Sequence, residues 1–319
     1  MIINDRVYGK VDITSPILIE LINSSALQRL KGIAQFGVPD KYYHHKNYYR
    51  FEHSLGVMIL LKKLGASEKE QIAGLIHDIS HTAFSHVVDW VIGSNKNEDF
   101  QDKQHALFLK KSDINKILIK YHLDLKDYLS NDNFSLLDLP IPELCADRID
   151  YAIREMPLSK TKYLFKSLRV FQNHFVFKNK NAALLFAKQF LKLHTLHWGA
   201  WETVVRYRLF AEAIKIAIKN SIVTMKDLWI DDKFVVQKLE KSKDKQIVNL
   251  LKILKKTLKQ LPLGKIIVQK KFRYVDPLYI NHGKLVRLST NDITFKKLLE
   301  KSQQNNSLGV QMPAIIKTI

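Results

Sequence analysis

The chain has 319 residues, which is enough for one large domain or two smaller ones with a substantial hydrophobic core. Hydrophobic residues make up 46% and charged residues 26%, as in soluble globular proteins, and no apolar run approaches membrane-spanning length. Cys145 is the one cysteine, which excludes an intramolecular disulfide and predicts a reducing, cytoplasmic compartment. The net charge of +20 predicts acidic partners such as nucleotides or nucleic acid, although a lysine-rich, soluble surface explains it equally well.

The first fifty residues predict a hairpin, then helices, then a loop. Residues 2–14 alternate loosely around Gly9, which indicates a short β-hairpin. Apolar residues recur at three- and four-residue steps over residues 15–33, as in amphipathic helices. Pro39 and the tyrosine-rich residues 42–49 interrupt this pattern and predict a loop.

A series of helices is expected next. One begins near Ser54, and a capping-box pattern formed by Ser67 and Glu70 opens the following one. That helix ends in the apolar run AGLI and presents His77 and Asp78, after which a further helix is expected over residues 80–93.

The remaining elements are mostly helical. We expect a helix from near His105, two short helices over 112–139, a helix containing CADRIDYAIREM, a small hairpin near 171–177, helices up to about Asn220, an amphipathic basic helix over 245–261, and two β-like runs joined by the turn NHG. The fold class is therefore mostly α, with small β-hairpin additions at the N-terminus and in the C-terminal region. Residues 1–225 are expected to form the core, and residues 226–319 a helical and β extension packed on it.

Four of the 12 histidines fall between Arg50 and His86, namely His53, His77, His81 and His86. Imidazole and carboxylate groups are preferred ligands of divalent metals that activate water. A lone buried histidine is more often a hydrogen-bonded core residue, but four with an adjacent aspartate favour a metal site.

His53, His77 and Asp78 leave room for a fourth ligand. The segment ELCADRIDYAIRE offers Asp147 and Asp150, and the small residues before Asp147 would allow its helix to approach a metal closely. Two imidazoles and two carboxylates suit a borderline divalent ion and leave positions for water and a substrate oxygen.

Three motifs carry a resemblance to a known family: RFEHSLGV (50–57), HDISHTAFSH (77–86) and DRIDY (147–151). In this order and spacing they resemble the HD-domain phosphohydrolases and, among them, the deoxynucleoside triphosphate triphosphohydrolases. The resemblance runs from Ile3 to about Ile218, and FRYVDPLYI and GKLVRLS are similar to C-terminal segments of small members. It implies an HD-domain helical fold and an enzyme that releases deoxynucleoside and intact triphosphate by water attack on the α-phosphorus.

The resemblance also implies roles for individual residues. The metal ligands would be His53, His77, Asp78 and Asp147, holding a divalent ion such as Mn, Fe, Co, Ni, Zn or Mg. His81 and His105 would act at the scissile phosphate, with His86 beside them. The substrate-binding set would comprise Arg50, Arg148 and Tyr151 at the triphosphate, and Gln35 and Glu155 near the sugar. The family also implies a homo-oligomer, a dimer or larger.

The chain departs from the family pattern at a few positions. Ala106 stands where a glutamate often follows the histidine matched by His105, which weakens a His–Glu pair acting on the leaving group. Trp201 and Thr203 replace a common tyrosine and histidine, so the sugar pocket is expected to differ.

Three other functions compete with this interpretation. His77-Asp78-x-x-His81 is similar to the zinc-peptidase pattern H-E-x-x-H, but its aspartate is one methylene shorter than the general-base glutamate. An HD-type nuclease, or a hydrolase of nucleoside mono- or diphosphates, would use the same metal centre and exploit the positive charge. A non-catalytic protein that binds nucleic acid would not need the full ligand set.

Overall fold

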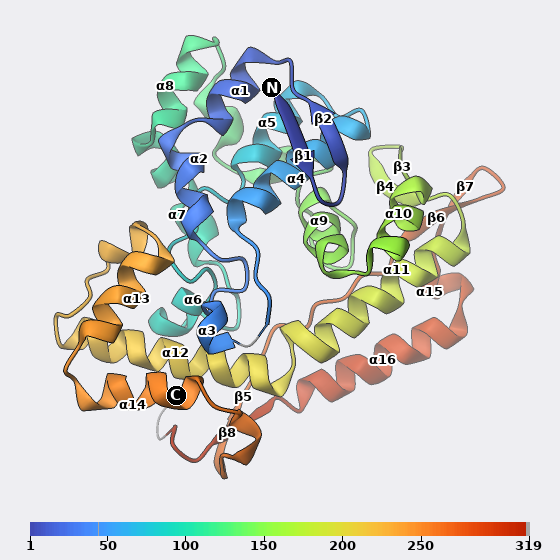
Figure 1. Cartoon of the computed structure of the whole chain (residues 1–319). Coiled ribbons are helices and arrows are strands. Elements are labelled where there is room, and N and C mark those ends of the chain that lie inside the picture. The colour runs from blue at the N-terminus through green and yellow to red at the C-terminus, as the bar shows by residue number, and fades with distance from the viewer. Residues whose placement is uncertain (44, 317–319) are drawn as a thin grey trace.

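Helices dominate the computed structural model, which describes residues 1–43 and 45–316 apart from the side chain of Asp132 (Figure 1). The helices of the first half are α1 (Pro16–Ile22), α2 (Ser25–Arg29), α3 (Asp40–Tyr43), α4 (Arg50–Lys63), α5 (Glu68–Ile76), α6 (Val87–Ile92), α7 (Phe100–Lys111), α8 (Asp113–Lys120) and α9 (Ala146–Glu155). Those of the second half are α10 (Leu158–Ser167), α11 (Lys180–Leu193), α12 (Trp201–Lys219), α13 (Asp232–Lys241), α14 (Lys245–Leu254), α15 (Leu288–Asn291) and α16 (Ile293–Ser307). The predicted fold class is confirmed.

The strands form three small sheets. β1 (Ile2–Asp5) and β2 (Gly9–Asp12) make the predicted N-terminal hairpin. A second sheet has the order β3-β4-β6-β7, and a third pairs β5 with β8. Their bounds are β3 (Leu168–Phe171), β4 (His174–Phe177), β5 (Leu263–Val268), β6 (Leu278–Asn281), β7 (Lys284–Arg287) and β8 (Val310–Pro313). Because β6 pairs in parallel with β4, the C-terminal region is attached to the middle of the chain.

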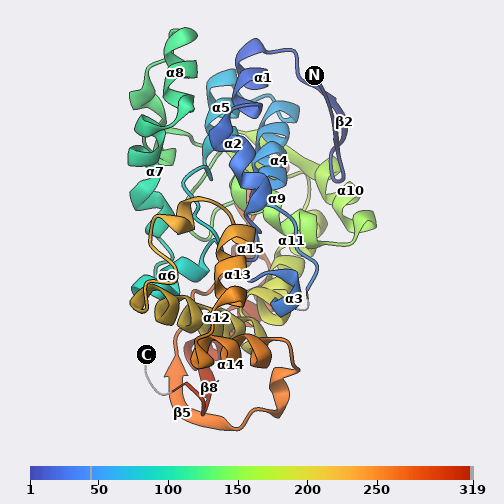
Figure 2. The same ribbon diagram turned by 60° about the vertical axis from the view of Figure 1, so that its left-hand side comes forward.

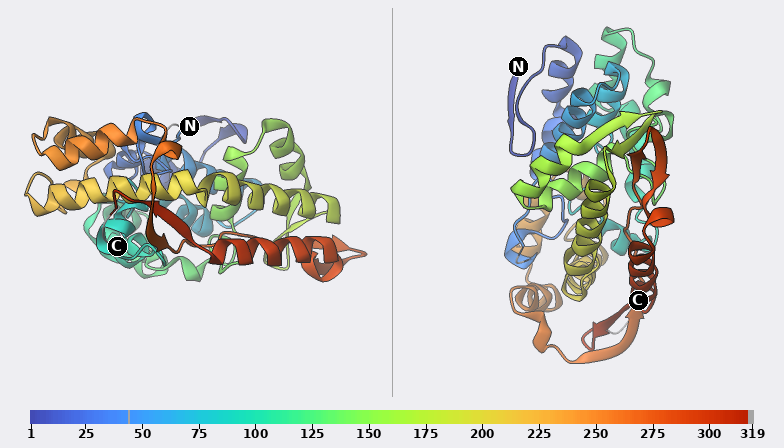
Figure 3. Two further views of the ribbon diagram at one scale, coloured as in Figure 1. Left: turned by 90° about the horizontal axis from the view of Figure 1, so that it is seen from below. Right: turned by 90° about the vertical axis from the view of Figure 1, so that its right-hand side faces the viewer.

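The helices are arranged around two neighbouring groups. α4 packs on α5 and α9 in the upper part of the molecule, beside the N-terminal hairpin (Figure 1). α11, a π-helical turn (His194–Trp198) and α12 follow one another along the length of the molecule, and α16 runs alongside them (Figure 3). α13 and α14 lie against α12, with β5 and β8 beyond them (Figure 2).

Two hydrophobic clusters stabilise this arrangement. The first gathers side chains from α1, α4, α5, α9 and α11, and the second from α6, α12, α13, α14, β5 and β8. The second cluster joins residues on both sides of position 225: the rings of Phe84 and Phe210 lie 4.8 Å apart, and Leu239 belongs to the same cluster. The division at residue 225 stays a prediction. Among the described residues, no helix is both long and apolar enough to cross a membrane.

Several boundaries near the histidine motifs differ from the expectation. The helix expected to begin near Ser54 begins at Arg50, so His53 lies in its first turn. The helix expected over residues 80–93 is wrong for its first half: only α6 is helical there, and residues 77–80 and 83–86 form turns. Phe84 and Ser85 have φ angles of 65° and 47°, in the left-handed region that an α-helix does not use.

Other differences have local causes. Ser67 caps α5 by accepting from the Glu70 backbone N–H at 3.2 Å, but the Glu70 carboxylate accepts from the backbone N–H of Leu136 instead of returning to the cap. The predicted loop over residues 42–49 begins inside α3 and includes His44, which lies outside the described residues. The basic helix expected to reach residue 261 ends at Leu254.

Candidate metal centre and active-site cavity

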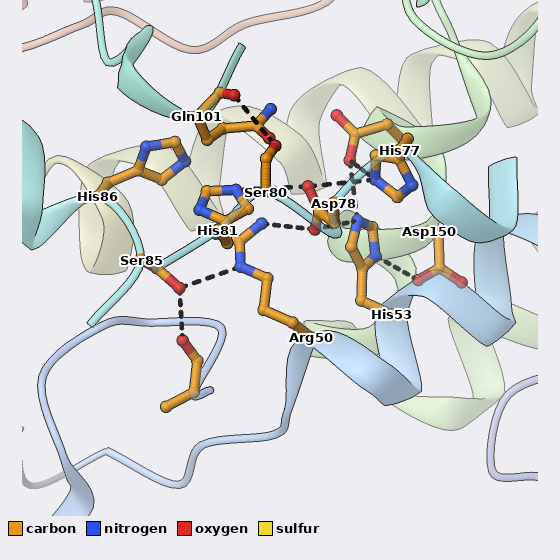
Figure 4. A network of polar contacts seen from close by, with 12 residues as sticks. Arg50, His53, His77, Asp78, Ser80, His81, Ser85, His86, Gln101 and Asp150 are labelled. Carbon is orange, nitrogen blue, oxygen red and sulfur yellow. Dashed lines mark hydrogen bonds and ion pairs between the residues drawn. The ribbon is translucent and has the colours of Figure 1, made fainter. Parts of the chain in front are cut away.

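The side chains expected to bind metal come from three elements that pack together. His53 lies in the first turn of α4, His77 and Asp78 directly follow α5, and Asp147 lies in the first turn of α9. One ligand atom from each of His53, His77 and Asp147 lies within 4.8 Å of the other two, and Figure 4 shows Asp78 beside them. The structure therefore brings the four residues together.

Hydrogen bonds on the outer side of each imidazole direct its Nε2 inward. His77 donates its Nδ1 proton to the backbone carbonyl of Gly74 at 2.8 Å, so Nε2 is the nitrogen that would bind a metal ion once it is deprotonated. That Nε2 is buried without a hydrogen-bond partner among the described residues, 3.6 Å from Asp147 and 3.4 Å from Asp78. An unpartnered nitrogen between two carboxylates fits a bound cation.

His53 is held in the same way by a charged partner. Its Nδ1 lies 2.8 Å from Asp150 Oδ2, and its Nε2 lies 2.9 Å from Asp147 Oδ1. Asp150 also accepts from Arg154 Nε at 2.7 Å, so its carboxylate is neutralised from behind. Asp150, the other candidate fourth ligand, therefore lies behind His53, as a carboxylate that orients a metal-binding histidine does.

The electrostatics of the group favour a positive ion. Burial opposes protonation of His77, but the carboxylates of Asp78 and Asp147 outweigh it and raise its pKa to about 9. Burial raises the pKa of Asp147, but the imidazoles of His53 and His77 lower it by more. The pKa of Asp147 is therefore below its ordinary value. Without a metal, the carboxylates hold a proton on an imidazole; a divalent cation would supply that positive charge instead.

Arg50 ties this group to the turns over residues 77–86. Its NH1 donates to Asp78 Oδ2 at 2.6 Å and its Nε donates to Ser85 Oγ at 3.0 Å. Ser85 Oγ in turn donates to the carbonyl of Ala34 at 2.7 Å (Figure 4). Arg50 is 4% exposed, so these contacts fix its guanidinium beside the metal ligands.

The two histidines in these turns lie beside each other. The rings of His81 and His86 are 5.1 Å apart and nearly perpendicular. His81 Nε2 lies 3.3 Å from Asp78 Oδ1, and His86 Nδ1 lies 3.1 Å from Asp89 Oδ2. Burial and the charge of Arg50 lower the pKa of His81 to about 3, so it is neutral near pH 7.

His105 is buried outside the group of metal ligands. It occupies the middle of α7, where its Nε2 lies 3.2 Å from the carbonyl oxygen of Tyr128 and its Nδ1 lies 3.5 Å from Ser80 Oγ. His105 does not line the cavity that contains His77, Asp78, His81 and His86. Its hydrogen-bond partners are Ser80 and the carbonyl of Tyr128, and neither residue lines that cavity.

The cavity also holds the residues expected to bind substrate. Gln35, Arg50, Arg148, Tyr151 and Glu155 all line it, together with Asp147. The side-chain oxygen of Gln35 is buried without a hydrogen-bond partner among the described residues, so it can accept a hydrogen bond from a ligand. Arg148 NH2 donates to the carbonyl of Leu139 at 3.0 Å and does not pair with acidic residues of its own helix.

Glu155 is already engaged inside the cavity. Its Oε2 accepts from His197 Nδ1 at 2.5 Å and its Oε1 accepts from Trp198 Nε1 at 2.7 Å. His197 and Trp198 belong to the π-helical turn between α11 and α12, and such turns are frequent at functional sites. The turn therefore positions a carboxylate on the cavity wall.

Three cations on the cavity wall were not predicted from the sequence: Lys270, Lys271 and Arg273. They belong to the segment between β5 and β6, which the sequence indicated as part of one β-like run. The sequence KKFR (270–273) shows that the segment is basic, but it does not indicate that the segment lies near Arg50.

A buried site of imidazoles and carboxylates, beside a cationic cavity in a helical fold, defines a metal-dependent hydrolase. Residues 50–154 match the model of the HD domain. The chain is 35% identical to protein YdhJ of Bacillus subtilis, over 97% of this chain and 98% of that protein. It is 30% identical to the metal-dependent phosphohydrolase cns2 of Cordyceps militaris, over 72% of this chain and 70% of that protein.

Two further similarities are narrower. A 103-residue segment is 36% identical to the human deoxynucleoside triphosphate triphosphohydrolase SAMHD1, covering 28% of this chain and 16% of that protein. A crystal structure of a phosphohydrolase from Bacteroides thetaiotaomicron has the same fold, with a TM-score of 0.70 and 18% identity over 94% of this chain and 97% of that one. The chain belongs to the HD-domain metal-dependent phosphohydrolases, and its cofactor is a divalent metal ion.

Proposed function

We propose that this phosphohydrolase hydrolyses deoxynucleoside triphosphates to deoxynucleoside and inorganic triphosphate. The observation that carries the proposal is the composition of one cavity, in which metal ligands, guanidinium groups and the polar side chains of Gln35 and Glu155 face the same space. Guanidinium groups bind phosphate oxygens with two hydrogen bonds, and the unpartnered oxygen of Gln35 suits a hydroxyl or amino donor. The short similarity to SAMHD1 supports the same substrate class.

In this proposal each group has one task. His53, His77, Asp78 and Asp147 hold a divalent ion, which when bound polarises a phosphoryl oxygen and lowers the pKa of water. Arg50, Arg148 and Tyr151 bind and orient the phosphates, while Gln35 and Glu155 bind the sugar. Water attacks the α-phosphorus and the bond to the 5′-oxygen breaks.

The leaving 5′-oxygen needs a proton, and we assign its donation to His86, which lines the cavity outside the metal group. His81, which is neutral near pH 7, donates a hydrogen bond to a phosphate oxygen instead. The rings of His81 and His86 lie 5.1 Å apart and line the same cavity, so both can serve one bound substrate. His105 acts behind Ser80 in this scheme, by fixing that turn of the chain.

The test is an incubation of the purified chain with each dNTP, each NTP and a single-stranded oligonucleotide, under Mn, Mg and Co in turn. Deoxynucleoside with intact triphosphate, resolved by ion-exchange chromatography, is the expected product pair. Release of pyrophosphate or orthophosphate would place the attack elsewhere and contradict the proposal. Mononucleotides from the oligonucleotide, with dNTPs untouched, would make the protein an HD-type nuclease. Homo-oligomer formation and nucleic-acid binding stay predictions.

A further inference from the structure

The chain between β5 and β6 crosses the active-site cavity without forming regular structure. Residues 269–277 connect the β5–β8 sheet to the sheet that contains β6. Arg273 forms an ion pair with Glu98, and the Phe272 ring packs 5.1 Å from His194 and 5.0 Å from Tyr274. The backbone N–H of Asp276 donates to the Pro142 carbonyl at 3.1 Å. These contacts hold the segment against the HD domain.

Two lysines of this segment line the cavity without an ion pair to a described carboxylate, although the charge of Lys271 lowers the pKa of Asp102 on the same wall against the effect of burial. Lys270 and Lys271 line the same cavity as Arg50 and Arg148. Lys270 donates to the Gly199 carbonyl and Lys271 donates to the Asn97 carbonyl at 3.3 Å. Among the described residues, neither ammonium has a carboxylate within ion-pair distance. An ammonium has three donors, so each lysine retains N–H groups for a ligand.

Arg273 has a different role from the lysines. Its guanidinium is paired with Glu98, so it anchors the segment and contributes little net charge to the cavity. Burial without a compensating anion lowers the pKa of Lys270, which indicates an ammonium that would gain from a negative ligand. The unneutralised positive charge of the segment is therefore concentrated at two adjacent residues.

We propose that Lys270 and Lys271 bind the phosphates beyond the scissile one and so select polyphosphate substrates over monophosphates. This inference rests on the proposed function, because it places the scissile phosphate at the metal ligands. Arg50 and Arg148 are engaged with groups of the HD domain, and the two lysines add charge that a monophosphate would not need. The C-terminal extension thereby becomes a specificity-determining part of the active site.

The test separates phosphate recognition from catalysis. Binding of inorganic tripolyphosphate and of orthophosphate to the metal-loaded, desalted full-length chain is measured by calorimetry. The double variant Lys270→Gln/Lys271→Gln is compared with Lys265→Gln, an exposed lysine of β5 outside the cavity. The double variant should bind tripolyphosphate about tenfold to a hundredfold more weakly, with orthophosphate binding unchanged. Lys265→Gln should match the wild type.

A charge-conserving variant distinguishes recognition from misfolding. Lys270→Arg/Lys271→Arg should retain most of the tripolyphosphate affinity. Wild-type affinity in the Gln double variant, or an equal loss for orthophosphate, would overturn the inference. A wild-type chain that binds tripolyphosphate through these lysines but cleaves no nucleoside triphosphate would overturn the proposed function alone. If the enzyme hydrolyses dNTPs, kcat/KM of the Gln double variant for a dNTP should fall by a factor similar to that for its tripolyphosphate affinity.

Discussion

Asp150 and Asp147 lie on opposite sides of the His53 ring. Asp150 Oδ2 is 2.8 Å from Nδ1, and Asp147 Oδ1 is 2.9 Å from Nε2. Asp150 is therefore placed to fix the tautomer of the imidazole, while Asp147 is placed to bind a metal ion together with it. The three-residue spacing of the two aspartates on α9 places them one above the other on the same helical face, so a single helix supplies both.

Replacing Asp150 should weaken metal binding without removing a ligand. In Asp150→Asn the amide can no longer accept the His53 proton with a full negative charge, so we expect metal affinity to fall about tenfold to a hundredfold. The measurement is a metal titration by calorimetry. Glu52→Gln is the matched control, because Glu52 accepts from Arg154 in the same network but does not touch His53. Equal affinity in Asp150→Asn and the wild type would contradict the assignment.

Replacing Asp147 should abolish metal binding. Asp147→Ala removes an oxygen that lies within 3.6 Å of Nε2 of both His53 and His77, and we expect loss of bound metal and of activity. Metal content after purification, measured by mass spectrometry, checks this. Asp138→Ala is the control, because Asp138 lines the same cavity but does not group with these two imidazoles. Full metal content and activity in Asp147→Ala would refute the proposed centre.

Gly56 is expected to be essential for the same network. A Cβ at this position in α4 would overlap Arg154 NH2 and Asp150 Oδ1. Breaking a buried ion pair costs about 3–5 kcal/mol, so Gly56→Ala should lower the free energy of unfolding by about that amount in urea titrations. Gly74→Ala is the comparison, because its Cβ would meet the flexible end of Leu61 and a smaller loss is expected. A smaller loss in Gly56→Ala than in Gly74→Ala would argue against a tight approach of α9.

The pKa of His105 predicts how stability responds to acid. Burial lowers that pKa to about 4, whereas the unfolded side chain titrates near its ordinary value of about 6.5. Between these values the unfolded chain binds the additional proton, so His105 makes stability fall as the pH drops from about 6.5 to about 4. The whole effect is on the order of 3 kcal/mol.

Urea unfolding of the metal-free protein at pH 7 and pH 5 measures this dependence. His105→Gln should lose less stability between the two pH values than the wild type does. His174→Gln, at an exposed histidine, should retain the wild-type dependence. An unchanged pH dependence in His105→Gln would mean that the imidazole is protonated in the folded state.

The residues predicted to bind metal are also the ones that the structure brings together, because their sequence signals are local. His53, His77 and Asp78 lie at helix ends whose apolar periodicity is clear, and Asp147 lies in a strongly amphipathic helix. The geometry of residues 77–86 could not be found in the same way. The left-handed backbone at Phe84 has no residue preference behind it and depends on contacts from the distant α13.

The position of Lys270, Lys271 and Arg273 in the cavity could not be predicted from the sequence either. Lys270 is more than a hundred residues from Asp147 in the chain, and its place in the cavity follows from the pairing of β6 with β4. Sequence periodicity predicts strands but not which distant strands pair, so the crossing segment was indicated as part of a single β-like run. The start of the helix around His105 was also misplaced. It was expected near His105, but α7 begins at Phe100, so this histidine lies in mid-helix beside Ser80.

Asp232 should control the shape of the catalytic turns from outside the HD domain. Its two carboxylate oxygens accept from the backbone N–H groups of Ala34, at 2.9 Å, and Phe84, at 2.7 Å. These residues adjoin Gln35, which lines the cavity, and Ser85, which accepts a hydrogen bond from Arg50 of the cavity wall, so one buried side chain of α13 supports both. Asp232→Ala leaves both N–H groups unpaired and releases the left-handed turn at Phe84.

We therefore expect Asp232→Ala to lower kcat about tenfold or more while the protein still binds one equivalent of metal. Asp231→Ala is the control, because Asp231 caps α13 through the Phe234 N–H and does not contact the turns. If both variants lost activity equally, the effect would come from α13 as a whole. If Asp232→Ala retained wild-type kcat, the turn at Phe84 would hold its conformation through its other hydrogen bonds, namely those of Ser85 with Arg50 and Ala34 and the backbone bond from Ala83 to Leu228.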